Sequence, residues 1–451
     1  MASAISFFTD LFIKKNHDSM RILDIFLYEF HHFRKSTAKI LTYLIFLFAC
    51  GYSIYSGFDL QNKQKATIEN IENKQQKEVL LVSNFFQNLS ILPNVLDVLG
   101  YIPTSATKHP SSLMPLGIGQ SEQYGYYKII TNWSSTYDND MVEEIANPER
   151  LVNGNIDFAF LVIFLLPILL IILTYNIRGL EQDLRFEKLI KIQFGSIPKW
   201  VFIRFSFYVI LLILTVILFI VFVALINNAI IDYSLELKSL ILLIILYVLF
   251  FATIFYLIVL TSDGSSSIAF KMISVWLLLC VVIPGSVHQY ASIVHPAHYM
   301  TDYLDTNRKE AYEIFELPLD SIYTRLLNIY PDLSQTKHAK KGEPNNEFRR
   351  NAICAIVNNL NKIAIDKIEE KNEKKNQLIR FSYWFNPVSY VQNTWNHYTS
   401  TNYYAYRDYR DDIQIIIDTK LKLLNFESWD EVEVTLPIYE NYLKDLGVAV
   451  D

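Results

Sequence analysis

The sequence predicts an all-α membrane protein with about five transmembrane helices. Apolar runs of about 20 residues interrupt the chain, and no charged residue lies in the middle of any of them. Backbone groups inside lipid have no water to bond, so each run must close its own hydrogen bonds as a helix. The predicted spans are 39–58, 158–177, 201–226, 237–260 and 268–286.

Before the first span, residues 1–38 predict an amphipathic helix in the membrane interface. Apolar side chains recur there at roughly helical spacing, and polar ones fall between them. The apolar set is Ile22, Leu23, Ile25, Phe26, Phe30 and Phe33, and the polar set is Asp24, Glu29, Arg34 and Lys35. A short, packed cytoplasmic helix is the alternative.

Basic residues in the short flanks predict the orientation, because cytoplasmic loops carry an excess of Lys and Arg. They are Lys14, Lys15, Arg21, Arg34, Lys35 and Lys39 before the first span, and Arg178, Arg185, Lys188, Lys191 and Lys199 in segment 178–200. We therefore expect a cytoplasmic N-terminus and a protein of the bacterial inner membrane. Five spans then place the C-terminus outside.

This topology makes two large, mainly helical segments extracytoplasmic, residues 59–157 and 287–451. No Gly or Pro occurs between Phe58 and Pro93, which predicts a long helix rising out of the first span. Residues 351–375 also lack a helix breaker.

The sequence carries no motif of a known catalytic or cofactor site. It has no P-loop, no H-E-x-x-H and no G-x-S-x-G, and its three cysteines are too few for a disulfide framework. His288, His295 and His298 cluster, but Pro296 breaks the helix that would align them on a metal. We expect no catalytic, cofactor-binding or metal-binding residue, and the uncharged middles of the spans argue against proton- or ion-coupled transport.

Short motifs in a fixed order resemble the permease subunits of type-2 ABC exporters, in an uncharacterised subfamily near the multicopper-enzyme-maturation permeases. The resemblance covers about 20 to 440. Around the second span the motifs are Asn147-Pro148 to Gly154, Asp157-Phe158, Leu166-Pro167, Tyr175-Asn176 and Glu181-Gln182-Asp183. The outer segments add Pro115 to Ser121, Tyr127, Val294-His295-Pro296, Arg308, Tyr330-Pro331, Phe385-Asn386-Pro387, Thr399 to Tyr404, Tyr409-Arg410 and Trp429.

The resemblance implies a dimer of permeases, identical or homologous, that works with two copies of a separate ABC ATPase, which binds the ATP. It implies that the 178–200 segment is a coupling loop that docks in a groove of that ATPase. The residues expected at this contact are Glu181, Asp183, Arg185, Phe186, Glu187, Leu189 and Ile190, and Phe194 extends their apolar face. A solvated loop is the alternative.

This chain departs from the family in two ways. The family's cytoplasmic segment is similar to Glu-Arg-Glu-x-Gly-Thr-Leu, whereas Glu181 to Glu187 lacks the Gly-Thr pair. The family also has a final span that we do not find here. Aromatic residues therefore fall at the outer interface, where we expect Trp384, Phe385, Tyr390 and Trp395 to cap an exit path.

The large outer segments favour a peptide, a lipoprotein or an envelope component as the molecule handled. The alternative function is a membrane-anchored receptor or assembly scaffold whose outer domain binds a partner. An intramembrane enzyme is disfavoured, because the spans lack a constellation of His, Asp, Glu or Ser. No basic block indicates a nucleic-acid partner.

Overall fold

The protein is mainly helical, as the sequence predicts. The computed structural model describes residues 22–86, 92–137, 156–296, 312–341 and 346–448. Within these ranges, β1 (Ser105–Thr107) and β2 (Tyr127–Ile129) pair antiparallel, and the other regular elements are helices. Five of the described helical runs are long and apolar enough to cross a membrane. The prediction of an all-α, multi-pass membrane protein is therefore confirmed.

Some predicted features lie outside the described residues. They include the basic residues of 1–21, the motif from Asn147 to Gly154, and His298 and Arg308.

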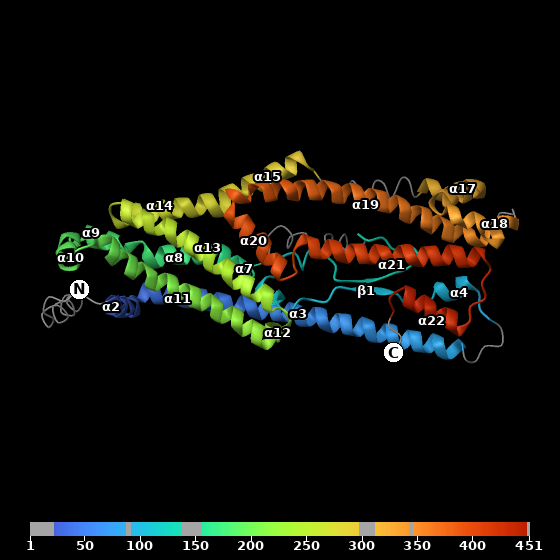
Figure 1. Cartoon of the computed structure of the whole chain (residues 1–451), viewed down its shortest axis with the longest axis horizontal. Helices are drawn as coiled ribbons and strands as arrows, with labels where there is room; N and C mark the ends of the chain where they lie inside the picture. The colour runs from blue at the N-terminus through green and yellow to red at the C-terminus, as the bar shows by residue number, and fades with distance from the viewer. Residues whose placement is uncertain (1–21, 87–91, 138–155, 297–311, 342–345, 449–451) are drawn as a thin grey trace. The chain divides into compact units, whose positions relative to one another are not determined.

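The chain forms two compact units. Unit 1 consists of Met1–Ser53 and Phe160–Ile283, and unit 2 consists of Ile54–Ala159 and Pro284–Asp451. Helix α3 (Thr37–Phe86) contributes residues to both units, and so does the helical run that ends in α15 (Ile283–Val294). The unbroken α3 confirms the predicted long helix (Figure 1).

Unit 1 holds the helix before the first span, most of the spans and the 178–200 segment. After α3, unit 1 resumes at Phe160, the last residue of α7 (Phe158–Phe160), and its further elements follow in chain order. They are η2 (Leu161–Leu165), α8 (Leu166–Thr174), α9 (Asn176–Asp183), α10 (Glu187–Phe194), α11 (Ile197–Ile226), α12 (Ala229–Asp232), α13 (Ser234–Thr261), α14 (Ser265–Leu277) and η3 (Leu278–Val282); α2 (Ile22–Lys35) precedes α3. The predicted loop 178–200 is thus largely helical.

Two π-helical stretches interrupt the spans, and each ends two residues before a proline, Pro167 or Pro284. Proline has no N–H and its ring collides with the carbonyl four residues earlier, so the helix widens locally. For Pro167 that carbonyl belongs to Ile163, and it accepts a hydrogen bond from the Tyr247 hydroxyl at 2.6 Å. The next carbonyl, of Phe164, accepts from Trp276 Nε1 at 2.9 Å. The Tyr247 side chain of α13 therefore satisfies the carbonyl that the proline leaves open, and Trp276 of α14 bonds the carbonyl next to it.

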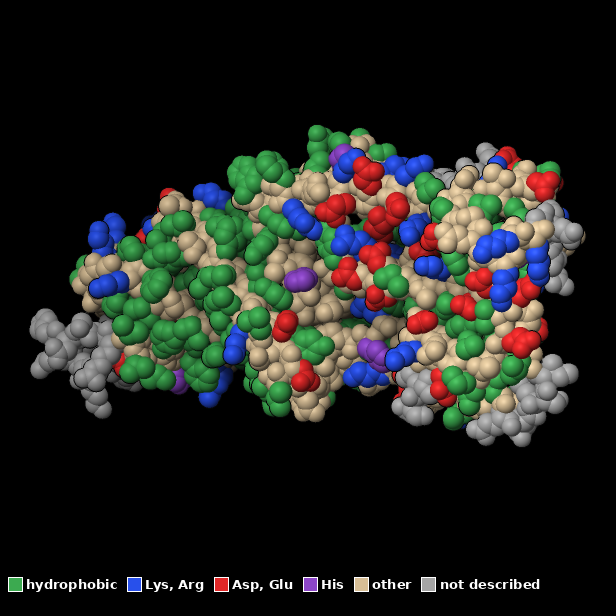
Figure 2. Space-filling view, turned by 45° about the vertical axis from the view of Figure 1, so that its right-hand side comes forward, with side chains coloured by type: hydrophobic (Ala, Val, Ile, Leu, Met, Phe, Trp, Pro, Cys, Tyr) green, Lys and Arg blue, Asp and Glu red, His purple; other side chains and the backbone are tan. Residues whose placement is uncertain are grey.

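The surface of the spans matches a lipid environment. Figure 2 shows hydrophobic side chains dense over unit 1, whereas Lys, Arg, Asp and Glu gather on unit 2. On α11 and α13, large apolar side chains such as Leu218, Leu214 and Leu246 are more than half exposed. Such a surface is unfavourable in water and favourable in hydrocarbon.

Unit 2 is built on two long helices, α19 (Arg349–Phe381) and α21 (Tyr403–Trp429), which pack against each other. The shorter elements are α4 (Val95–Leu99), η1 (Met114–Leu116), α17 (Leu319–Ile329), η4 (Pro331–Gln335), α18 (Lys337–Lys341), η5 (Asn346–Phe348), η6 (Ser382–Trp384), α20 (Pro387–Tyr398) and α22 (Leu436–Asp445). Two asparagines set helix starts: the Asn386 side chain accepts from the Ser389 N–H at 3.3 Å, and Asn402 accepts from Ala405 at 3.1 Å.

The core of unit 2 has several apolar clusters along these helices. Trp429, 1% exposed, joins one of them, where its ring lies 5.0 Å from those of both Tyr323 and His338. Leu424 of α21 packs with α4 and α22 in a second cluster. Unit 2 therefore has an apolar core of its own, as a large domain requires.

Candidate coupling site

The 178–200 segment turns sharply at two positions that differ in residue type. Gly195, between α10 and α11, has φ 79°, a region that glycine enters freely. Arg185, between α9 and α10, has φ 61° although it carries a Cβ. The backbone geometry of this turn is therefore one that glycine accommodates more easily than arginine.

Arg204 is the centre of a buried ion cluster beside this segment. Its Nε lies 2.5 Å from Glu29 Oε2 of α2, and its Nη1 lies 2.5 Å from Glu181 Oε1 of α9. The same Nη1 donates to the Ile177 carbonyl at 3.1 Å. Glu29 is fully buried and Arg204 is 5% exposed. One guanidinium thus joins three helices of unit 1.

Neighbouring side chains add hydrogen bonds to the two carboxylates, while the buried Glu181 Oε2 has no hydrogen-bond partner among the described residues. The Tyr208 hydroxyl donates to Glu29 Oε1 at 2.5 Å and accepts from Lys39 Nζ at 2.8 Å. Trp200 Nε1 donates to Glu181 Oε1 at 2.9 Å. Buried charges are tolerated when they are paired and hydrogen-bonded in this way.

The electrostatics of the cluster favour ionised Glu29. Burial by itself disfavours the carboxylate, but Arg204 stabilises it, with further contributions from His32 and Lys39. Together they hold the pKa of Glu29 far below its usual range. Arg204 and Lys39 are therefore the cations that stabilise ionised Glu29.

The other side of α9 is fastened to the turn between α13 and α14. Arg178 donates to the carbonyls of Val259, at 3.0 Å, and Leu260, and lies 2.9 Å from Glu187. Asp183 accepts from the Ser265 hydroxyl.

Two further contacts set how closely this turn approaches α9. The Gly264 N–H donates to Gln182 Oε1 at 2.9 Å. A Cβ on Gly179 would lie 2.5 Å from the Ser265 backbone, so only glycine fits there.

The structure separates the predicted docking residues into two groups. Phe186 and Leu189 are about half exposed at 48% and 50%, and Ile192, which is not among the predicted docking residues, is 81% exposed. Ile190 is buried at 8% exposure.

The predicted polar residues of the segment also fall into two groups, one held in ion pairs and one exposed. Glu181 and Glu187 are held in ion pairs within unit 1, while Asp183 is exposed and hydrogen-bonded, and Arg185 is exposed. Contact with an ATPase remains a prediction for all of these residues.

The predicted exit aromatics also differ in their surroundings. Trp384 is 79% exposed, and Phe385 and Tyr390 are partly exposed. Trp395 is fully buried in unit 2, where its Nε1 donates to the Leu116 carbonyl at 3.0 Å. Trp395 is therefore part of the core of unit 2, and the capping of an exit path stays a prediction for all four residues.

Sequence reasoning missed the two residues at the centre of the cluster. It placed Glu29 on the polar face of an amphipathic helix, whereas Glu29 is fully buried against α11. Arg204 lies near the start of the predicted span 201–226 and is not among the basic residues used to predict the orientation. Its charge inside this span was the available signal, because an arginine in an apolar run needs a partner.

Comparison with known proteins gives no relative for this chain: no family model, no curated protein and no solved structure matches it. Among the described residues, no group of three or more His, Cys, Asp or Glu side chains is placed to hold a metal ion.

Proposed function

We propose that this chain is the permease subunit of an ATP-driven ABC transporter, with ATP bound and hydrolysed on a separate subunit. The observation that carries the proposal is the joint placement of an exposed apolar face and a buried ion cluster on one segment between two spans. A docking element must offer a surface to its partner and must also be stiffly joined to the helices it moves.

The exposed surface is supplied by Phe186, Leu189 and Ile192 on and beside α10. These side chains form an apolar patch on a short helix that two turns set apart from its neighbours, at Arg185 and Gly195. In helix-in-groove recognition, apolar side chains at helical spacing bind in the groove of the partner. We assign this patch to the ATPase groove.

The stiff connection is supplied by the contacts of α9. Arg204 ties α9 to α2 and α11, and Arg178, Gln182 and Asp183 tie it to the α13–α14 turn. A displacement of α9 therefore acts on several spans of unit 1 at once. Charged hydrogen bonds of this kind resist separation more strongly than apolar contact alone.

The proposed topology follows from the same assignment. The 178–200 segment faces the cytoplasm of a bacterial cell, and residues 59–157 and 287–451 lie outside the inner membrane. The permease works as a dimer, and its outer segments handle a peptide, a lipoprotein or an envelope component.

The test is co-purification of the ATPase with two matched variants. Phe186→Asp places a charge in the proposed contact, and Phe85→Asp makes the same change at a comparably exposed phenylalanine of α3 in unit 2. We expect F186D to lose the ATPase while it still inserts and purifies, because an unpaired charge in an apolar groove costs about 1–3 kcal/mol or more. F85D should retain it. Equal recovery of the ATPase with both variants would contradict the docking proposal.

A further inference from the structure

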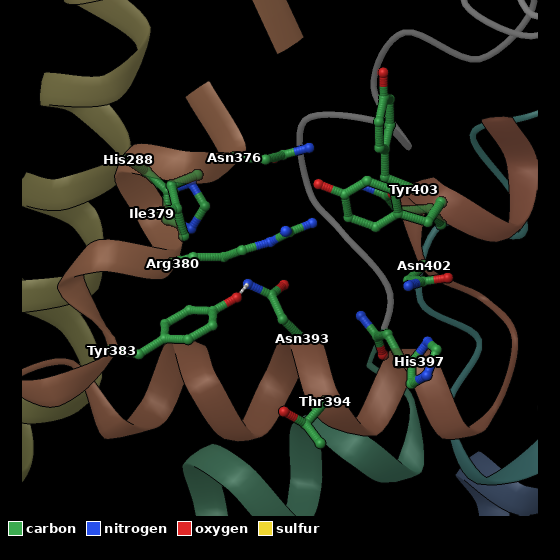
Figure 3. Close-up of a pocket in the computed structure, with 13 residues that line it drawn as sticks. His288, Asn376, Ile379, Arg380, Tyr383, Asn393, Thr394, His397, Asn402 and Tyr403 are labelled. Carbon is green, nitrogen blue, oxygen red and sulfur yellow. Dashed lines mark hydrogen bonds between the residues drawn. The ribbon is translucent and has the colours of Figure 1, made fainter. Parts of the chain in front are cut away.

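Unit 2 contains a cavity of about 470 Å³ at the junction of α15, α19, α20 and the start of α21. Its volume falls in the range of small-molecule sites, roughly 300–1,000 Å³. Figure 3 shows the Arg380 side chain extending into this cavity between Asn376 and Asn393, toward the side where Asn402 and Tyr403 lie. None of the described residues that line it is an Asp or a Glu.

Arg380 gives the cavity a positive charge that its neighbours only partly offset. Among the described residues the nearest carboxylate is Glu373, whose Oε1 lies 4.0 Å from Arg380 Nη1, beyond hydrogen-bond range. Glu373 is also 3.7 Å from Arg407 and accepts from the Tyr404 hydroxyl at 3.0 Å. One carboxylate is therefore shared between two guanidiniums, and the planar fork of Arg380 is left facing the cavity.

A second observation points to the same cavity. Gln120 lines it, and within the described residues the buried Gln120 Oε1 has no hydrogen-bond partner. This oxygen is closed off from solvent, and a buried amide oxygen without a donor is costly, so turning the Gln120 amide toward a ligand O–H or N–H in the cavity would relieve that cost. The side-chain amides of Asn376, Asn393 and Asn402 add donors and acceptors around the same space.

We propose that this cavity binds a small anion that carries hydroxyl groups, with its phosphate or carboxylate at Arg380 and a hydroxyl at Gln120. Arginine recognises both anions through paired N–H donors, and carboxamides recognise hydroxyls as donor and acceptor together. The same chemistry occurs in a soluble glycerol phosphate and in the headgroup of an anionic glycerophospholipid. The proposal does not depend on the docking of an ATPase.

The test is calorimetric binding of sn-glycerol 3-phosphate to the full chain in a neutral detergent, with inorganic phosphate and glycerol as partial ligands. We expect glycerol 3-phosphate to bind more tightly than phosphate, and glycerol alone to give no signal. Arg380→Gln should weaken binding of both anions about 10- to 100-fold, the usual effect of removing a charge-assisted hydrogen-bonding pair.

Arg407→Gln is the matched control. Arg407 lies over the same Tyr404 ring as Arg380, at 4.9 Å against 4.7 Å, and approaches the same Glu373, but it does not line the cavity. R407Q should bind like the unchanged protein. Equal weakening by R380Q and R407Q, or no binding of glycerol 3-phosphate to the unchanged protein, would overturn the proposal.

A second variant keeps the test independent of the arginine. Gln120→Leu should leave the affinity for inorganic phosphate within about twofold and abolish the preference for glycerol 3-phosphate, because only the hydroxyl contact is removed. An unchanged preference in Q120L would remove Gln120 from the site and contradict the proposed orientation. Equal melting temperatures for all variants confirm that they are folded.

An experiment in lipid nanodiscs distinguishes a soluble anion from a lipid headgroup as the ligand of this cavity. In nanodiscs of phosphatidylglycerol, a headgroup ligand occupies the site and suppresses binding of glycerol 3-phosphate, whereas phosphatidylcholine nanodiscs do not. Suppression assigns the site to the lipid headgroup, and persistence in both assigns it to a soluble anion. Either result supports the proposed chemistry.

Discussion

Arg204 and Glu29 meet at 2.5 Å although 175 positions separate them along the chain. The pair fastens the N-terminal helix α2 to the span α11, and its guanidinium also reaches Glu181 of α9. An amphipathic helix that only floated in the interface would keep its charges in water. Here α2 is instead a packed part of unit 1, and its position is set by a charge buried among the spans.

Glu29→Gln should destabilise the protein strongly, because Arg204 then loses a charged partner in a buried site. Removing one member of a buried pair costs about 3–5 kcal/mol, so thermal unfolding in detergent should shift down by many degrees. The exposed pair Lys63–Asp59 is the control, and Asp59→Asn should change stability by less than about 1 kcal/mol. If E29Q melted like the unchanged protein, the cluster would not be structural.

The coupling of Glu29 with Arg204 is measurable in a double-mutant cycle. The double variant E29Q/R204Q should be less destabilised than the sum of the two single variants by about 0.5–3 kcal/mol. Strict additivity would show that the two residues act independently.

Tyr247→Phe should weaken the packing of α13 against the π-helical stretch η2. The change removes the donor to the Ile163 carbonyl and leaves that oxygen open inside the unit. Hydrogen bonds between membrane helices contribute about 0.5–2 kcal/mol, which sets the expected loss of unfolding free energy. Tyr256→Phe removes a hydroxyl that donates to the Pro198 carbonyl at an exposed position, and it should have a smaller effect.

Arg185→Gly should stabilise the protein, because the backbone at this position has φ 61°. Relief of the left-handed conformation outweighs the added freedom of the unfolded chain, and we expect a gain of about 0.5–1 kcal/mol. Arg185→Ala keeps a Cβ and should give no such gain. A loss of stability in R185G would mean that the arginine side chain itself holds the turn.

We expect the stability of unit 2 to depend on pH, because the ammonium group of Lys420 is buried there. This ammonium donates to the carbonyls of Ile102 and Ile130 and to the Thr104 hydroxyl. Burial lowers the pKa of Lys420 to about 8, below the roughly 10.4 of an unfolded lysine. The unfolded chain therefore binds more protons between these values, and stability rises with pH across that window.

Lys420→Met tests this dependence. The variant should lower the slope of unfolding free energy against pH by about 1.4 kcal/mol per pH unit between pH 8 and 10. Lys108, whose pKa burial also lowers to about 8, contributes the same sign and should keep part of the slope in the variant. An unchanged slope in K420M would contradict the role of Lys420.

The spans were predictable because a membrane helix is specified locally. Each run closes its own hydrogen bonds, so apolar length alone predicts it, and the absence of Gly and Pro after Phe58 similarly predicted the length of α3. The split of 178–200 into α9 and α10 was not predictable, because Arg185 gives no turn signal of the kind that glycine provides.

The sites were harder to predict because they depend on pairing across long separations. Nothing near Glu29 in the sequence indicates that its partner is Arg204. The cavity of unit 2 likewise combines Gln120, His288 and Arg380 with the start of α21. A single sequence carries no record of such contacts, and only the packing of the helices brings these side chains together.

The most direct test of the account is the mass of the intact complex, measured by native mass spectrometry after extraction from its own cells in a mild detergent. We expect an assembly of two permease chains, this one twice or with a homologous partner, and two copies of an ATP-binding protein. The complex should hydrolyse ATP, whereas the purified chain alone should not. A single chain without an ATP-binding partner, or ATP hydrolysis by the pure chain, would contradict the proposal that it is the permease of an ABC transporter.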